Sequence, residues 1–316
     1  MAKYTVKRLL QSLLTVFIIV SIVFVLMRML PTDYYFTEEQ QMKYDEETKH
    51  DMLQAAGLLD PIPTQLFRFY RGLLRLDFGE SRRIQTGVSV WSIVAGKFTI
   101  SMRLGLIAMA ISLAVGVILG VLQARQKDRL MDHVGTVYTV FVNSVPPLVS
   151  YSLVLAFGAR ILKLPSLYSN RNPGPSSILP IACLALTSIA HYALWTRRYM
   201  VDESTKDYIK LARIKGMSSQ SIMVKHVLKN AFVPLAQYIP ASLLLTLGGS
   251  LLVERFFSVP GMGTLMVDAI QRYDTEVVQT CVMIYAFLGI IGVFLGDLAM
   301  TLFDPRIKLA GGGETR

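Results

Sequence analysis

The chain has 316 residues, of which 53% are hydrophobic and only 17% are charged, with a formal net charge of +10. Soluble domains carry roughly 25% charged residues, so this composition argues against an ordinary water-soluble protein. The basic excess could suggest a nucleic-acid partner, but no basic patch is interleaved with exposed aromatic residues, so we expect none.

Six apolar runs predict six membrane-spanning helices, and the predicted fold class is an all-α integral membrane protein. About 20 residues are needed to cross ~30 Å of hydrocarbon as a helix. The first run follows Lys3, Lys7 and Arg8 but is too long for a signal peptide, which predicts an uncleaved anchor. The third run contains Pro146 and Pro147, which predict a kink. The runs cover residues 9–30, 99–122, 134–160, 178–199, 232–253 and 277–302.

The distribution of Lys and Arg among the short loops predicts the orientation of the chain. An N-terminus on the cytoplasmic side places most of these basic residues inside, as the positive-inside rule requires, and it also places the C-terminus inside. This orientation predicts four regions. They are a tail with the first span (1–30), an extracytoplasmic segment (31–98), a core with five spans (99–302) and a cytoplasmic tail (303–316).

The extracytoplasmic segment begins with an acidic run of helical character. Such a run is either a solvated face or a docking surface for an external partner. The residues after it place Leu66, Tyr70, Leu73 and Leu74 on one helical face, which predicts packing on the outer membrane surface or on a neighbour. The acidic residues are Glu38, Glu39, Asp45, Glu46, Glu47 and Asp51.

Motifs for enzyme chemistry do not occur in the sequence. There is no G-x-x-x-x-G-K-[ST], H-E-x-x-H or G-x-S-x-G pattern, and the four His residues are too dispersed to predict a metal site. Cys183 and Cys281 both fall within apolar runs, where we expect buried small side chains rather than a disulfide. We therefore expect no catalytic residue, no metal and no cofactor.

Polar residues inside the apolar runs have two interpretations. They either form hydrogen bonds between helices or line a water-filled path, and their occurrence in several spans favours a path for some of them. A secondary carrier or channel would also need such a path, but we find no repeated halves and no intramembrane carboxylate pair. The candidate path residues are Asn143, Ser144, Ser188, His191 and Gln237.

The densest basic segment lies in the loop 200–231, between two apolar runs. Residues 202–215 predict a helix that Gly216 ends, and Ser218 or Ser219 can cap a second helix. The pair is either an interfacial element attracted to anionic lipid or a docking element for a cytosolic partner, and the tight glycine turn favours docking. One predicted face carries Tyr208, Leu211 and Ala212, and the second helix has an apolar stripe of Met223, Val224, Val227, Leu228 and Ala231, with Lys225 and Lys229 pointing away.

The stretch DYIKLARIKGMSSQSIMVKHVLKNAFVP resembles the cytoplasmic EAA-type loop of ABC importer permeases, in its oligopeptide and dipeptide variant. Ala212 and Gly216 fit the general pattern, whereas Lys210 and Leu211 replace its Glu and first Ala. The variant resembles D-Y-x-x-x-A-x-x-K-G followed by H-x-L-x-N-A-x-x-P, which this chain matches. LRLDFGES, FFSVPGMGTLMVDAI and LFDPRIK also resemble the B-type subunit of that family, so the resemblance covers nearly the whole chain.

The resemblance implies a permease subunit of an ATP-driven importer for oligopeptides or dipeptides, in a bacterial or archaeal cell (inner) membrane. A second homologous permease subunit, two cytosolic ABC ATPase subunits and an extracytoplasmic substrate-binding protein would be its partners, and the ATPases would hydrolyse ATP. The alternatives are another substrate, such as a nickel chelate or small saccharide, a secondary carrier, and a membrane anchor for a cytosolic complex. The implied ATPase-coupling residues are Asp207, Tyr208, Leu211, Ala212, Lys215, Gly216 and His226.

Overall fold

The computed structural model describes residues 2–36, 38–247 and 250–303. Over these ranges the chain is helical apart from loops and one isolated bridge between Glu80 and Ser89. The tail predicted for residues 303–316 lies outside the described residues from residue 304 onwards.

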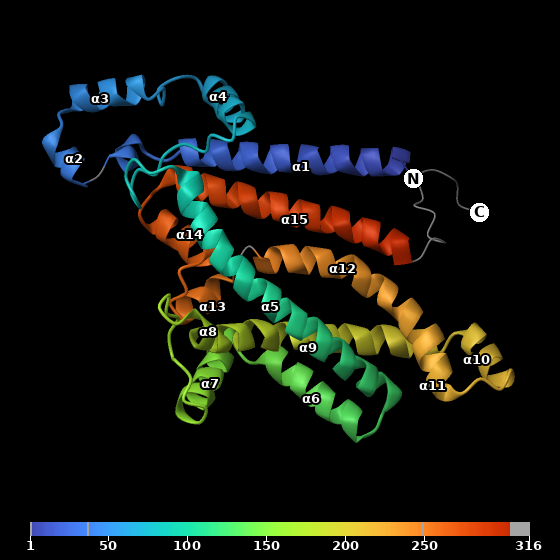
Figure 1. Cartoon of the computed structure of the whole chain (residues 1–316). Coiled ribbons are helices and arrows are strands. Elements are labelled where there is room, and N and C mark those ends of the chain that lie inside the picture. The colour runs from blue at the N-terminus through green and yellow to red at the C-terminus, as the bar shows by residue number, and fades with distance from the viewer. Residues whose placement is uncertain (1, 37, 248–249, 304–316) are drawn as a thin grey trace.

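Five long helices form the body of the molecule, and α5 (Val90–Arg125) crosses the others obliquely (Figure 1). Among the described residues, four segments are long and apolar enough to cross a membrane: Val6–Arg28, Val90–Arg125, Pro173–Ser204 and Thr275–Met300. The chain is therefore a multi-pass helical membrane protein. The long helices are α1 (Ala2–Arg28), α5 (Val90–Arg125), α9 (Ile178–Ser204), α12 (Lys229–Leu247) and α15 (Thr275–Phe303).

The predicted third span is broken at the two prolines. Helix α6 (Leu130–Ser144) and helix α7 (Pro147–Arg160) are bent by 114°, so residues 134–160 form two helices and not one straight span. Val145 has extended backbone angles, which a residue before proline prefers, and Pro147 begins α7 at a position where no backbone N–H is needed. The kink is confirmed, and if the bent pair is one span the described chain has up to five.

The predicted fifth span also differs from the structure. Helix α12 ends at Leu247, and residues Leu251–Phe256 form the separate helix α13, so residues 232–253 are not one continuous helix. Ser250, which precedes α13, has extended backbone angles (φ −105°, ψ 107°).

Short elements gather at the two ends of the long helices (Figure 1). One end, called here the outer end, carries most of the short helices. The opposite end, the inner end, carries the N-terminus, the α5–α6 connection, α10, α11 and the π-helix η2. The outer elements are η1 (Thr32–Tyr35), α2 (Glu38–Lys43), α3 (Glu46–Ala55), α4 (Ile62–Leu74), α8 (Pro173–Ser176), α13 and α14 (Met262–Gln271), and the inner ones are α10 (Asp207–Ile214), α11 (Ser219–Ile222) and η2 (Met223–Leu228).

Glycines allow two pairs of long helices to approach closely. Gly116 and Gly120 of α5 lie against the backbone of α9, and Gly292 and Gly296 of α15 lie against the backbone of α12. A Cβ atom on Gly296 would lie 2.1 Å from the carbonyl oxygen of Gln237. Both pairs are spaced four residues apart, as in the small-xxx-small pattern of membrane helix interfaces.

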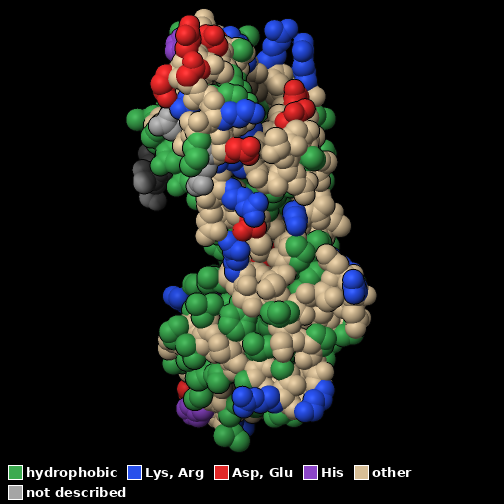
Figure 2. Space-filling model, turned by 90° about the vertical axis from the view of Figure 1, so that its left-hand side faces the viewer, with side chains coloured by type: hydrophobic (Ala, Val, Ile, Leu, Met, Phe, Trp, Pro, Cys, Tyr) green, Lys and Arg blue, Asp and Glu red, His purple; other side chains and the backbone are tan. Residues whose placement is uncertain are grey.

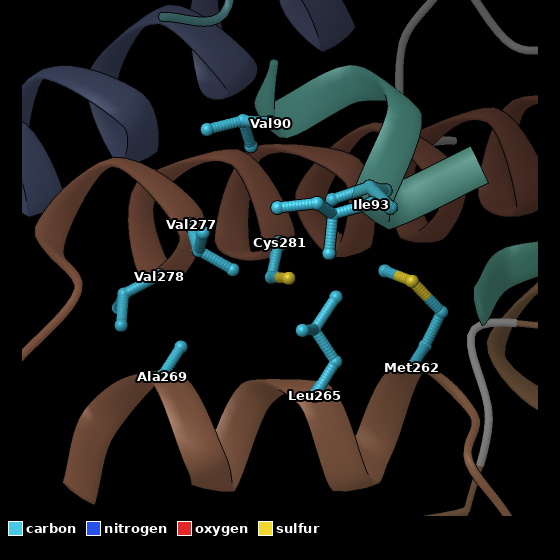
Figure 3. Close-up of a cluster of buried hydrophobic side chains, with 9 residues drawn as sticks. Val90, Ile93, Met262, Leu265, Ala269, Val277, Val278 and Cys281 are labelled. Atoms are coloured by element: carbon cyan, nitrogen blue, oxygen red, sulfur yellow. The ribbon is translucent and has the colours of Figure 1, made fainter. Parts of the chain in front are cut away.

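A cluster of buried apolar side chains joins three helices near the outer end (Figure 3). Cys281 of α15 is fully buried in this cluster, and Cys183 is buried elsewhere, so the expectation of two buried, unpaired cysteines is confirmed. The cluster fixes α14 against the first turn of α5. Its members are Val90, Ile93 and Val94 of α5, Met262, Leu265 and Ala269 of α14, and Val277, Val278 and Cys281 of α15.

The segment 31–98, called here the outer segment, packs on α1 by means of its helix α4. The ring of Tyr70 stacks on Phe17 with centroids 5.0 Å apart, and its hydroxyl lies 2.8 Å from the Ser21 hydroxyl. The expectation that this helical face packs on a neighbour is confirmed for Tyr70. Leu74, the last residue of α4, is 88% exposed and so does not pack on a neighbouring element of the described chain.

Candidate functional site

The helices α10, α11 and η2 at the inner end, residues 207–228, are called here the inner element, and a break in the predicted helix precedes them. Helix α9 ends at Ser204 and α10 begins at Asp207, so the single helix predicted for residues 202–215 is wrong at its start. The hydroxyls of Ser204 and Thr205 donate to backbone carbonyls three residues before them. Such side-chain bonds compete with the helical backbone pattern and favour a turn.

The turn after α10 agrees with the sequence rules. Gly216 has φ +78°, a left-handed conformation that favours glycine, and it follows the last residues of α10. Ser218 is the N-cap of α11 and accepts a hydrogen bond from the Ser221 backbone N–H at 3.3 Å. Both the glycine turn and the serine cap are confirmed.

The second helix continues as a π-helix, η2, and not as the predicted α-helix. Val227 is buried, while Val224 is 53% exposed, so Val224 does not belong to the buried stripe. A π turn contains more residues than an α turn, which shifts the buried face relative to α-helical spacing. Lys225 and Lys229 are exposed, as predicted.

Helix α10 buries one face against the rest of the inner element and leaves another exposed. Ile209 and Ala212 are buried against Met200, Ile222 and Val227. By contrast Leu211 is 52% and Ile214 is 82% exposed. These two side chains form an uncovered apolar tip on the inner element, and Ile214 was not among the predicted residues.

A polar cluster holds the inner element in place. The Tyr208 hydroxyl donates to the Glu203 carboxylate, and the Asn230 side-chain amide donates to the Tyr208 oxygen at 2.7 Å and to Glu203 at 3.3 Å. Burial and the neighbouring carboxylate raise the pKa of Tyr208 to about 12, so the hydroxyl keeps its proton. The cluster joins the end of α9, the start of α10 and the start of α12, and sequence reasoning missed Glu203.

The other predicted coupling residues lie around this element. Asp207 is exposed and pairs with Lys210 at 2.8 Å, and Lys215 is exposed at the C-cap of α10. His226 is half-buried within η2. All the predicted coupling residues therefore lie on α10, its turn and η2.

A buried ion pair fixes α6 to α9 next to the inner element. Asp132 is 3% exposed and accepts hydrogen bonds from two guanidinium nitrogens of Arg197, one of them at 2.7 Å. It also accepts from the Asp128 backbone N–H at 2.9 Å. Bidentate pairing of this kind fixes the relative orientation of two side chains.

The predicted path residues fall into two groups. His191 on α9 stacks on Tyr238 of α12 with ring centroids 4.7 Å apart, and Ser188 lies three residues earlier on the same helix. Gln237, beside Tyr238, donates to Asp297 of α15 at 3.2 Å.

Asn143 and Ser144 form the second group. Both are exposed at the end of α6, before the 114° bend, and within the described residues no hydrogen bond joins them to the first group. The structure therefore places Ser188 and His191 on one helix and Gln237 on the helix that His191 contacts through Tyr238, and it leaves Asn143 and Ser144 apart.

An aromatic stripe continues from His191 along α9 towards the inner end. Trp195 lies 6.1 Å from His191 and 5.4 Å from Tyr199 between ring centroids, and Arg198 lies over the Trp195 ring at 5.0 Å. Residues 191, 195 and 199 are spaced four apart, so they share a helix face. This spacing is visible in the sequence, but the stripe was not among the predicted path residues.

A buried carboxylate fixes the outer elements. Glu254 of α13 is 3% exposed and accepts hydrogen bonds from the Ser101 hydroxyl at 2.6 Å and from the backbone N–H groups of Gly263 and Thr264 at 2.7 and 3.1 Å. It thus joins α5, α13 and the first turn of α14. Burial raises the pKa of Glu254 above its usual value, although the three hydrogen bonds oppose the shift.

Glu254 predicts a pH dependence of stability. The pKa of Glu254 is higher in the folded than in the unfolded chain. Its contribution to the free energy of unfolding is therefore fully present below the unfolded pKa, and it is lost as pH rises through the folded pKa. We expect the difference in melting temperature between the native protein and Glu254→Gln to fall over that window. Thermal unfolding across a pH series measures this difference, and a difference that stays constant or grows with pH would contradict the assignment.

Comparison with known proteins adds an independent observation. The model of a family described as binding-protein-dependent transport system inner membrane component matches residues 116–309. The chain is 33% identical over 309 residues to the dipeptide transport system permease protein DppB of Bacillus subtilis, covering 98% of this chain and 99% of the relative.

Two further relatives agree over the same length. The DppB protein of Lactococcus lactis subsp. cremoris is 31% identical over 98% of this chain and 100% of its own. The oligopeptide transport system permease protein OppB of Haemophilus influenzae is 29% identical over 98% of this chain and 100% of its own. The similarity therefore includes the inner element and the outer segment.

Proposed function

Because the chain belongs to the binding-protein-dependent transport system inner membrane components, we propose that it is the permease subunit of an ATP-driven importer for dipeptides or oligopeptides. The names of its relatives, two dipeptide permeases and one oligopeptide permease, support this substrate class. A second, homologous permease subunit supplies the other half of the pathway, and an extracytoplasmic binding protein delivers the peptide at the outer end.

The proposed topology has six spans, with both termini in the cytoplasm of a bacterial or archaeal cell. The bent pair α6–α7 is the third span and α12 is the fifth. The inner end carries the N-terminus and the basic segment 200–231, and the positive-inside rule supports a cytoplasmic position for it (Figure 1). Residues 31–98 then lie outside, residues 99–302 form the core, and residues 303–316 lie inside.

The inner element couples the permease to an ATPase subunit in this proposal. The observation that carries it is the apolar tip of Leu211 and Ile214, which is exposed on an element that the Tyr208 cluster holds rigid. A groove on a cytosolic partner suits such a compact tip, since binding would remove apolar surface from water. Two ATPase subunits hydrolyse ATP, one on each permease subunit, and their closure shifts the spans between inward-open and outward-open states.

The peptide path follows the polar and aromatic stripe of α9. Ser188 and His191 face the pathway together with Gln237 on the adjoining helix α12. The stacking of His191 on Tyr238, the residue next to Gln237, supports this assignment. Asn143 and Ser144 contribute at the bend of the third span.

Substituting Leu211→Asp and Ile214→Asp together tests the coupling role. Both side chains are exposed, so we expect the chain to fold normally. Fewer ATPase subunits should co-purify with the complex, because this chain loses its own contact, and peptide uptake into proteoliposomes should fall at least tenfold.

Leu74→Asp is the matched control, since Leu74 is an exposed leucine at the outer end. It should leave ATPase association unchanged. Normal ATPase association and uptake in the double variant would exclude the apolar tip as the coupling surface.

A further inference from the structure

A large cavity lies at the outer end, apart from the candidate path and the inner element. Its volume is about 1080 Å³, slightly above the usual range of small-molecule sites. It lies between the end of α1, the helices α2 to α4, the loop 77–87 and the first turns of α15. Aromatic side chains form part of its wall: Phe24, Tyr35, Phe36, Tyr44, Phe69 and Phe78.

Two buried N–H donors in this cavity have no acceptor among the described residues. They are the Nε of Arg28 and the side-chain Nε2 of Gln279. Gln279 is only 5% exposed, so its amide is removed from solvent within the chain. Buried donors in proteins are nearly always satisfied by protein groups, water or a ligand, so these two donors are available to acceptor oxygens within the cavity.

The positive charge of Arg28 favours a ligand group of negative charge. Arg28 donates to the Tyr35 hydroxyl at 3.0 Å and lies over the Phe24 ring, but no carboxylate pairs with it in the part of the chain that is described. Two other arginines of the cavity wall do pair with carboxylates: Arg82 pairs with Glu276 at 3.3 Å, and Arg68 pairs with an aspartate. A half-buried guanidinium with an unsatisfied N–H, in the same cavity wall as an amide donor, fits a carboxylate.

Carboxylates of the wall provide the opposite charge. Glu39, Asp77 and Glu80 line the cavity and are exposed, and none of them forms an ion pair among the described residues. The exposed Lys43 adds one positive charge to the same wall. Figure 2 views this end and shows acidic side chains mostly in its upper half, with basic side chains among and below them. The cavity therefore offers partners for both ends of a zwitterion.

We propose that the cavity binds a short peptide, with the C-terminal carboxylate on Arg28 and Gln279 and the N-terminal ammonium group on the exposed carboxylates. This inference rests on the proposed peptide-import function and adds a site that belongs to the permease itself. The aromatic wall accepts side chains of differing size, because apolar contacts do not demand one shape. The site would hold a peptide between its release by the binding protein and its entry into the membrane path.

The test uses the complete transporter in lipid nanodiscs, without binding protein and without nucleotide. Radiolabelled tri-alanine should bind saturably, and unlabelled tri-alanine amide should compete at least tenfold more weakly than the free acid because it lacks the carboxylate. This comparison needs no substitution in the protein. Absence of tri-alanine binding, or equal competition by acid and amide, would overturn the proposal.

Substitutions in the cavity wall test whether tri-alanine binds in this cavity. Arg28→Gln and Gln279→Leu should each weaken tri-alanine binding about tenfold or more. Arg71→Gln removes an exposed arginine of α4 that does not line the cavity, and it should bind as the native protein does. Unchanged binding in both cavity variants would overturn the proposal, as would an equal loss in Arg71→Gln.

Uptake measured with the binding protein and ATP separates this inference from the proposed function. Peptide uptake by a native complex that fails to bind tri-alanine in the nanodisc assay would overturn the cavity site alone. Loss of all peptide uptake by a correctly assembled complex would overturn the proposed function itself.

Discussion

Gly296→Ala is expected to lower the stability of the folded chain by about 3 kcal/mol, at the upper end of the usual overpacking cost. The new Cβ atom would lie 2.1 Å from the carbonyl oxygen of Gln237. That atom belongs to the backbone of α12, so a side-chain rotation cannot relieve the overlap and the two helices must separate. Thermal unfolding in detergent and the yield of monodisperse protein measure the effect.

Gly96→Ala is the matched control for this prediction. It makes the same change in a long helix, but nothing lies within 4 Å of the position that the new Cβ would occupy. Alanine is the better helix former, so we expect stability to stay the same or rise by about 0.5–1 kcal/mol. Equal melting temperatures for Gly96→Ala and Gly296→Ala would contradict the close packing of α12 and α15.

Asp132→Leu is expected to cost about 3–5 kcal/mol of stability, because it leaves Arg197 without its partner in a mostly buried position. Only 27% of the Arg197 side chain is exposed, and Asp132 supplies both acceptor oxygens. The pair fixes α6 to α9 close to the inner element, so we also expect weaker ATPase association. Thermal unfolding and co-purification measure the two effects.

The double variant Asp132→Leu with Arg197→Leu separates loss of pairing from loss of packing. Replacing a buried ion pair with apolar residues of similar size is often neutral. We therefore expect the double variant to recover most of the stability that Asp132→Leu loses. If the two single losses simply add, the ion pair does not contribute as described, since contacting partners should show a coupling energy.

Local rules predicted much of the helical framework. Apolar runs of spanning length located the long helices, and Pro146 and Pro147 located the break between α6 and α7 because their effect on the backbone is local. The same rules misplaced helix ends. Helix α5 begins at Val90, well before the predicted span at residue 99, because the first turns pack in the cluster with α14 and α15. That packing is tertiary, and no window of sequence contains it.

In the inner element, too, local features were predictable and tertiary contacts were not. Gly216 and Ser218 were predictable, since a glycine turn and a serine cap depend on neighbouring residues only. The exposed tip was not, because the sequence does not say which face of α10 finds a partner within the chain. The bond between Asn230 and Tyr208 joins residues 22 apart, and the unsatisfied donor of Gln279 depends on a cavity built from distant segments.

The length of α5 has a mechanical consequence for the whole molecule. The helix runs unbroken for 36 residues, from the cluster with α14 near one end to Arg125 at the other, and contains no proline. At 1.5 Å per residue it measures about 54 Å, well beyond the ~30 Å hydrocarbon thickness. A helix without a break cannot absorb a tilt by bending, so a tilt that moves its inner end one way would move its outer end the opposite way.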